Sequence, residues 1–127
     1  DEVYFTVTQY SSVRGSAQTR IPMFPTHWLS KHLSQLKQVS LWQGEVGEQE
    51  SIQLVLTLIE HDVPPWNVDD HLGSVKLNLM QEQGRLKSKW GIPNYQDQTK
   101  ISTSDNLTYD FQGPDGEYQV TFKLSVN

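Results

Sequence analysis

The chain has 127 residues, with 15 acidic against 10 basic side chains, a formal net charge of −5 and no cysteine. This length suits one domain over residues 1–127, and the missing thiols exclude disulfides, thiolate metal sites and thiol nucleophiles. The acidic balance, with no stripe of Lys and Arg, excludes nucleic-acid binding as a class. The sequence contains no apolar run long enough to span a bilayer and does not begin with a signal peptide. We therefore expect a soluble domain, either peripheral to a membrane or exported from a bacterium.

Strand patterns dominate the chain. Residues 3–8 are rich in β-branched and aromatic types, residues 38–43 alternate, and residues 52–59 and 72–79 form two further apolar or alternating runs. The polar segment 81–105 is ambiguous, with a short strand over 86–92 as one interpretation. Residues 107–111 and 117–126 flank a turn at 113–116, and the last run alternates cleanly.

One helix is expected near residues 26–37. Leu29, Leu33 and Leu36 recur at helical spacing after a Pro-Thr start, over about three turns at most. Alternating runs with one polar face are typical of antiparallel sheets. The predicted fold is therefore all-β, an antiparallel β-sandwich of about seven to eight strands with this one short helix.

The most informative stretch is the acidic loop of residues 60–71. Glu60 and Asp62 lie at one root of the loop, and Asp69 and Asp70 lie at the other. Clustered carboxylates repel one another unless a cation lies among them, and Ca²⁺ prefers such oxygen ligands. The stretch predicts a calcium site.

The pattern over residues 52–79 resembles a C-two domain, the calcium- and phospholipid-binding β-sandwich. An apolar strand ends in the acidic triplet Glu60-His61-Asp62, and after a short loop Asp70 stands three residues before Gly73, which opens the next strand. The resemblance implies that Glu60, Asp62 and Asp70 are calcium ligands and that the loop tip, Trp66, enters lipid. The expected partner is accordingly a phospholipid membrane surface, or else a protein.

The sequence also departs from the family. Glu stands at position 60 where Asp is usual, the loop is longer, and residues 11–37 supply no further carboxylates. Because strand 52–59 is about 26 Å long at ~3.3 Å per residue, acidic residues that precede it cannot reach the loop that follows it. If 86–92 is a strand, Asp97 and Asp105 return to the loop as additional ligands; if it is not, Asp115 and Glu117 return instead.

A metal-free interpretation competes with calcium. Residues 3–44 contain no Asp or Glu, so Arg14 or Arg20 could neutralise the acidic loop in a structural or interaction domain of a larger or secreted protein. His61 and His71 raise the idea of a zinc site. However, His61 alternates with Glu60 along the strand, so its side chain should point the other way, and solvated histidines are the preferred interpretation.

Trp66 has two interpretations, an anchor on a membrane or ligand and a cap on the core. A glycan-binding variant would use Trp66, Trp90 and Tyr95 as stacking platforms. No Gly-x-Ser-x-Gly, His-Glu-x-x-His or phosphate-binding glycine motif is present, and a small sandwich offers no groove for a paired-carboxylate glycosidase. We therefore expect a binding module and not an enzyme.

Overall fold

The computed structural model describes residues 2–23, 27–61, 69–93, 105–113 and 116–126. Its elements are β1 (Glu2–Ser11), β2 (Gly15–Ile21), β3 (Trp28–Leu29), the 3-10 helix η1 (Ser30–Gln35), β4 (Ser51–His61), β5 (Asp70–Glu82), β6 (Arg85–Gly91), β7 (Asn106–Gly113) and β8 (Gly116–Lys123). The predicted all-β class is confirmed: antiparallel strands make up a sandwich-like fold with one short 3-10 turn. None of the described residues forms a helix long and apolar enough to cross a membrane.

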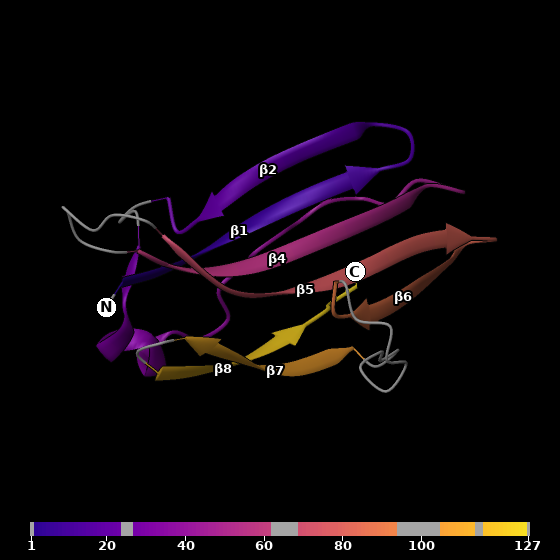
Figure 1. Cartoon of the computed structure of the whole chain (residues 1–127). Helices are drawn as coiled ribbons and strands as arrows, with labels where there is room; N and C mark the ends of the chain where they lie inside the picture. Colours follow the sequence, from indigo (N-terminus) through magenta and orange to yellow (C-terminus); the bar gives the residue numbers. More distant parts are fainter. Residues whose placement is uncertain (1, 24–26, 62–68, 94–104, 114–115, 127) are drawn as a thin grey trace.

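Six strands form one antiparallel sheet in the order β2-β1-β4-β5-β6, with β3 pairing the start of β1. The hairpin β7–β8 forms a separate two-stranded sheet that lies against the long one (Figure 1). We call the face of the long sheet that points to this hairpin the inner face and the opposite one the outer face. The acidic end is the end at which β4 finishes and β5 begins, and the far end is the one with the β1–β2 and β5–β6 turns.

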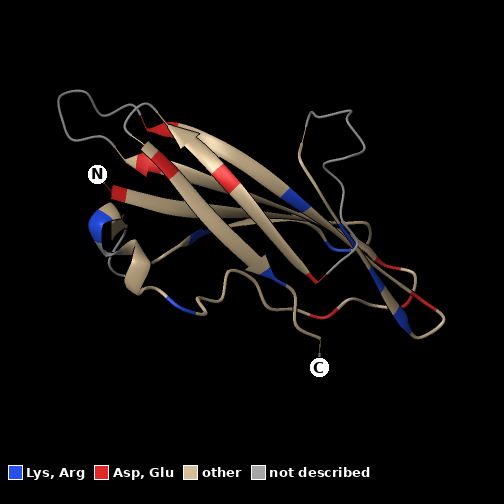
Figure 2. Cartoon of the chain, turned by 90° about the horizontal axis from the view of Figure 1, so that it is seen from below, with Lys and Arg blue, Asp and Glu red and all other residues tan. Residues whose placement is uncertain are grey.

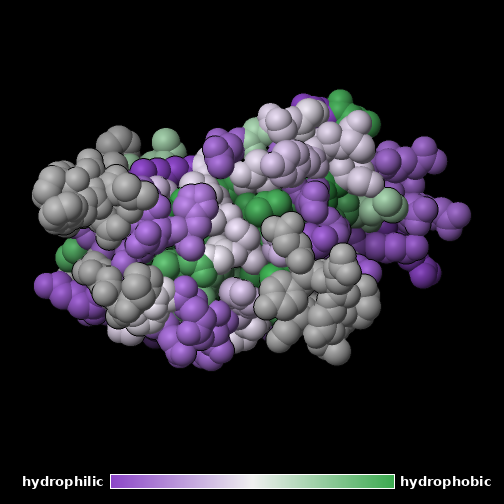
Figure 3. Space-filling model, in the orientation of Figure 1, coloured by the Kyte–Doolittle hydropathy of each residue, from purple (hydrophilic) through white to green (hydrophobic). Residues whose placement is uncertain are grey.

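The core lies on the inner face because alternate positions of the long strands are apolar. Val3, Phe5 and Val7 of β1 are buried, as are the even-numbered residues of β4 from Ile52 to Leu58. Phe111 and Phe122 of the hairpin pack edge-to-face on Phe5, with ring centroids 6.1 and 5.8 Å away. Figure 3 shows hydrophobic residues on the visible face as separate patches among hydrophilic ones, as expected when the apolar faces are turned inward.

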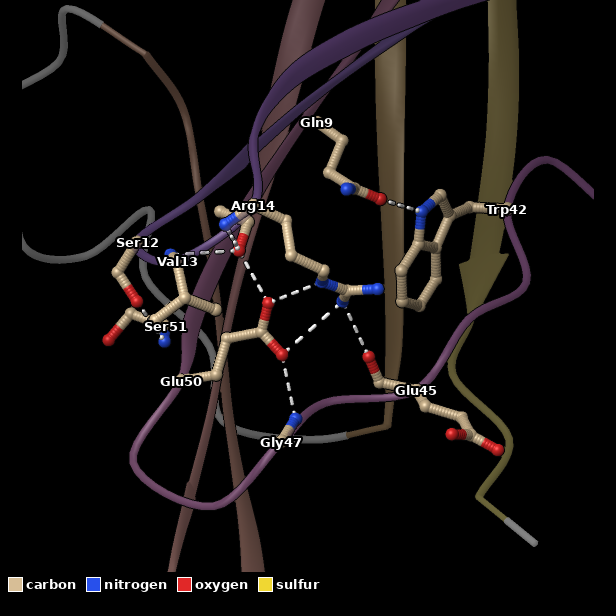
Figure 4. Close-up of polar contacts among 10 residues, drawn as sticks. Gln9, Ser12, Val13, Arg14, Trp42, Glu45, Gly47, Glu50 and Ser51 are labelled. Atoms are coloured by element: carbon tan, nitrogen blue, oxygen red, sulfur yellow. Dashed lines mark hydrogen bonds and ion pairs between the residues drawn. The ribbon is translucent and has the colours of Figure 1, made fainter.

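Residues 36–50 complete the second layer beside the hairpin, and they correct one prediction. The expected strand over 38–43 does not form; Gln38 has a positive φ of 57°, which strand backbone does not adopt. Trp42 instead packs against the core, and its indole Nε1 donates to Gln9 Oε1 at 2.7 Å (Figure 4). Residues 38–43 therefore alternate in sequence although they form no strand, because they belong to an irregular segment that crosses the inner face of the sheet.

An ion pair between Arg14 and Glu50 joins the end of this crossing segment to the far end of the sheet (Figure 4). The Glu50 carboxylate is buried, with 3 % of the residue exposed. It accepts hydrogen bonds from Ser11 Oγ, from the Gly47 N–H at 2.7 Å and from Arg14 Nε at 2.8 Å. These donors, the Ser11 hydroxyl first, lower the pKa of Glu50 to about 2.

Two further expectations need correction. Strand β2 was not expected; six of its seven residues are exposed, so it has no buried face to produce an alternating pattern. The expected three-turn helix is a six-residue 3-10 helix, η1. Leu33 packs on the core, whereas Leu29 and Leu36 are 38 % and 37 % exposed, so the helical spacing of the three leucines does not make one buried stripe.

Candidate functional site

Two of the expected ligands meet on the inner face at the acidic end. In the β4–β5 ladder Glu60 is the register partner of Asp70, and Val3 of β1 lies on the other side of Glu60. Register partners in an antiparallel pair present their side chains to the same face, with Cβ atoms about 5 Å apart. The fold therefore brings two carboxylates together across adjacent strands.

Glu60 is the more enclosed of the two, with 1 % of the residue exposed. The Tyr118 hydroxyl of β8 donates to Glu60 Oε2 at 3.3 Å, so the hairpin reaches the acidic end and covers this carboxylate. Asp70 is half-buried at the first position of β5. A buried carboxylate opposite a second one is electrostatically unfavourable, because like charges facing each other across a strand pair repel.

Gly73 explains part of this geometry. The β4–β5 register shifts between Leu58 and Ile59, and Gly73, the partner of Leu58, has a φ of 145°. A Cβ at this position would lie 3.2 Å from Phe111 Cδ1. The glycine of the family-like Asp-x-x-Gly spacing is thus required by backbone conformation and by the close approach of the hairpin.

Asp69 points to the outer face, away from the Glu60–Asp70 pair. Its Oδ2 accepts a hydrogen bond from the Tyr4 hydroxyl at 2.5 Å, and its Oδ1 lies 3.0 Å from His61 Nδ1. Desolvation by burial, followed by the hydrogen bond to Asp69, raises the pKa of Tyr4 to about 12. The Tyr4 phenol therefore stays protonated at neutral pH and donates its hydrogen bond to Asp69 at this root of the loop.

Further polar groups extend the outer-face network. The rings of His61 and His27 stack at 5.4 Å with an interplanar angle of 14°, and His27 Nε2 lies 3.1 Å from a Glu2 carboxylate oxygen. The Arg20 guanidinium carbon lies 3.6 Å from the centre of the Tyr4 ring. Alternation along β1 would have placed Tyr4 on the outer face, but only the non-sequential pairing of β1 with β4 brings it to the end of β4, where its hydroxyl contacts Asp69.

The histidine prediction is right in one part and wrong in another. His61 does point away from Glu60, as alternation along β4 requires. It is not a solvated side chain, however, because it is half-buried and contacts Asp69 and His27. His71 is exposed.

The two proposed counter-ions, Arg14 and Arg20, lie towards opposite ends of the sheet. Arg14 binds Glu50 at the far end and does not neutralise the acidic loop. Arg20 does lie at the acidic end, where it contacts the loop root through Tyr4. The difference follows from β2, because Arg14 immediately precedes this strand at the far end and Arg20 is its penultimate residue, towards the acidic end.

The remaining expected site residues lie either outside the described part of the chain or away from the acidic end. Asp62, Trp66 and Asp97 lie outside the described residues. Strand β6 forms over Arg85–Gly91, in agreement with the interpretation of residues 86–92 as a short strand. Asp105 nevertheless does not lie near the acidic loop. It precedes β7, and the opposite end of that strand, Gly113, is the part that approaches Leu72 beside the acidic end.

Two absences apply to the described parts of the chain. There, no group of three or more His, Asp or Glu side chains is arranged to hold a metal ion. Of the three aromatic platforms expected for a glycan, Tyr95 and Trp66 fall outside those parts, and Trp90 is a core residue with 3 % exposure. Trp90 therefore cannot stack on a ligand at the surface.

Acidic residues occur at both ends of the long sheet in Figure 2, and basic residues lie among them at the far end and also beside the N-terminus. This agrees with the Arg14–Glu50 pair at the far end and with the paired carboxylates Glu60 and Asp70 at the acidic end. The comparisons with known proteins give no match: no family model, no curated protein and no solved structure is significantly similar to this chain.

Proposed function

We propose that this domain is a non-catalytic, C-two-like binding module that takes up Ca²⁺ weakly at its acidic end. The observation that supports it best is the register pairing of Glu60 with Asp70, which puts two carboxylates on one face at the loop roots. The cation relieves their repulsion, and Asp62 in the connecting loop supplies further oxygens. Asp69 holds the loop root through Tyr4 and His61, so we assign it a positioning role.

Calcium suits this arrangement better than a transition metal because all the proposed ligands are hard oxygens. Ca²⁺ needs six to eight oxygen ligands, and two or three carboxylates leave several positions for water or for lipid phosphate. Affinity is therefore expected in the range of about 10⁻⁴–10⁻³ M, as in extracellular modules. Phosphate oxygens that complete the coordination would couple calcium to a phospholipid surface, with Trp66 as the apolar contact.

A calcium titration followed by amide NMR shifts tests this proposal. Addition of millimolar CaCl₂ should shift the amides of Glu60 and Asp70, whereas the same concentration of MgCl₂ should shift them less, because Mg²⁺ gives up its water reluctantly. Glu60→Gln should remove the response, and Glu45→Gln, an exposed glutamate at the far end, should keep it. Unchanged amides at the acidic end would reject the metal and leave the fold as described.

A second candidate function is a metal-free structural or interaction domain. The specific observation in its favour is the outer-face network, in which Asp69 is bound by the neutral Tyr4 phenol beneath the Arg20 guanidinium. For this candidate Arg20→Glu should lower the melting temperature in EDTA, and Ca²⁺ should restore little of the loss. Arg14→Glu is not an equivalent test, because Arg14 stabilises the far end through Glu50.

A further inference from the structure

A groove of about 700 Å³ crosses the outer face of the long sheet near the far end. Its central row is a set of register partners on four adjacent strands, namely Tyr10, Gln53, Asn78 and Lys89. The floor comes from the neighbouring row, whose side chains face the core; Ile52, for example, is 1 % exposed. The groove thus has a backbone floor and side-chain walls, and its volume is typical of a small-molecule site.

The central row carries three kinds of recognition chemistry. Strands lie about 4.8 Å apart, so four register partners span roughly 14 Å across the sheet. Tyr10 is 50 % exposed, and its partner on β2 is the small Ser16, which leaves the aromatic ring accessible. The Gln53 and Asn78 amides both donate and accept hydrogen bonds, and Lys89 ends the row with a cation.

A second row of side chains deepens the groove. Ser51, Met80 and Lys87 are register partners next to the central row. In Figure 4 Ser51 is turned away from the Arg14–Glu50 contact. Lys87 is bound by Glu82 at 2.9 Å, and among the described outer-face residues of β5 and β6 this is the only carboxylate. Lys76 and Lys89 on the same face leave it positive in a chain with net charge −5.

We propose that this groove binds an oligosaccharide that carries acidic groups, such as a uronic-acid oligomer. An aromatic ring offers a flat apolar surface to the C–H face of a sugar, and amide groups match neighbouring hydroxyls because both partners donate and accept. The lysines complement the acidic groups of the ligand. A nucleic acid is a poorer fit, since the row holds one aromatic ring and the protein as a whole is acidic.

NMR titration with tetragalacturonate, a linear tetramer of uronic acid, tests the proposal at millimolar ligand. Amide shifts should follow the row from Tyr10 to Lys89. Tyr10→Ala should weaken binding roughly tenfold or more, as expected for truncation of a central contact, while Tyr10→Phe keeps the ring and should retain binding. Lys89→Ala should reduce binding, whereas Lys123→Ala on β8 is the matched control. Circular dichroism of each variant checks the fold.

Two further ligands decide the chemical class. Cellotetraose, a neutral tetramer, should bind more weakly than tetragalacturonate to the wild type and about equally to Lys89→Ala. Hexaglutamate should not produce the row of shifts. The proposal is overturned if tetragalacturonate leaves the row unshifted, if Tyr10→Ala binds like the wild type, or if hexaglutamate binds as well. The groove lies at the opposite end from Glu60, so these results are independent of the calcium proposal.

Discussion

Neutralising Glu60 is the sharpest test of the acidic end, because it changes charge with little change in shape. Glu60→Gln keeps the side-chain volume, and the Tyr118 hydroxyl can donate to the new amide oxygen as it does to Oε2 at 3.3 Å. What the substitution removes is one of the two charges that face each other across β4 and β5. Without calcium the variant should therefore be more stable than the wild type.

The size of the effect follows from the register. At about 5 Å between the paired side chains and an effective dielectric constant of about 20, two like charges repel by about 3 kcal/mol. Asp70 is only half-buried, so water screens part of this repulsion, and we expect a gain of about 1–2 kcal/mol for Glu60→Gln. For a chain of this length that corresponds to a rise in melting temperature of about 4–8 °C.

The assay is thermal unfolding in EDTA and again in millimolar CaCl₂, for Glu60→Gln, Asp70→Asn and the double variant. Once one charge is gone the second neutralisation should add little, so the two effects should not be additive. Calcium at ten times its dissociation constant adds about 1.4 kcal/mol to a protein that binds it. The wild type should gain this in CaCl₂, and Glu60→Gln should gain much less.

Two results would refute this reasoning. If both single variants melt at or below the wild-type temperature in EDTA, the facing carboxylates do not repel, and the argument for a cation between them is lost. If Glu60→Gln is stabilised by calcium as much as the wild type, the cation binds elsewhere. An equal rise in Glu45→Gln, at an exposed position of the far end, would show that net charge and not the pair is responsible.

Four more outcomes are expected. Gly73→Ala should cost about 1–3 kcal/mol in urea unfolding, because its φ is 145° and the added Cβ would lie 3.2 Å from Phe111 Cδ1; Gly84→Ala should cost less, because Gly84 also has a positive φ, of 75°, but its added Cβ meets nothing within 4 Å. The pKa of Tyr4 is raised from 10.0 to about 12, so its stabilising contribution is complete below pH 10 and lost as pH rises to about 12; Tyr4→Phe should flatten alkaline unfolding in that window. The pKa of Glu50 is lowered from 4.5 to about 2, so the stability difference between wild type and Glu50→Gln should shrink as pH falls from 4.5 to about 2, measured by urea unfolding at several pH values. Trp66→Ala should abolish calcium-dependent liposome sedimentation with little change in melting temperature; a drop of several degrees would identify Trp66 as a core cap.

The strands that could be predicted are those with one buried face. Strands β4, β5 and β8 carry alternating side chains because the inner face is covered and the outer face is wet. Strand β2 lacks this signal because six of its seven residues are exposed. Residues 38–43 alternate without pairing, since Trp42 packs on the core from a crossing segment. Alternation thus reports one-sided burial and does not by itself report strand pairing.

The candidate site, like the strands, could be predicted from the sequence only in part. Sequence placed Glu60 and Asp70 at the two roots of one loop between adjacent antiparallel strands, which is enough to expect that they meet. Asp69 follows a register shift between Leu58 and Ile59 that lies next to Gly73, where the hairpin packs closely on β5, and neither feature has a local sequence pattern. Partners such as Tyr4 and His27 come from distant segments, so no local pattern indicates them.

The division of the acidic end between two faces has a consequence for how it can work. On the outer face Asp69 is compensated by hydrogen bonds to Tyr4 and His61, so this root of the loop is fixed without a metal. On the inner face Glu60 and Asp70 are register partners, and Glu60 is enclosed by the hairpin through Tyr118. A cation that enters the inner face therefore changes charge at loop roots that are already held in place. Calcium would then change mainly the charge of the acidic end and little the position of the loop roots, which is the behaviour expected of a docking module whose affinity for an anionic surface is switched by neutralisation.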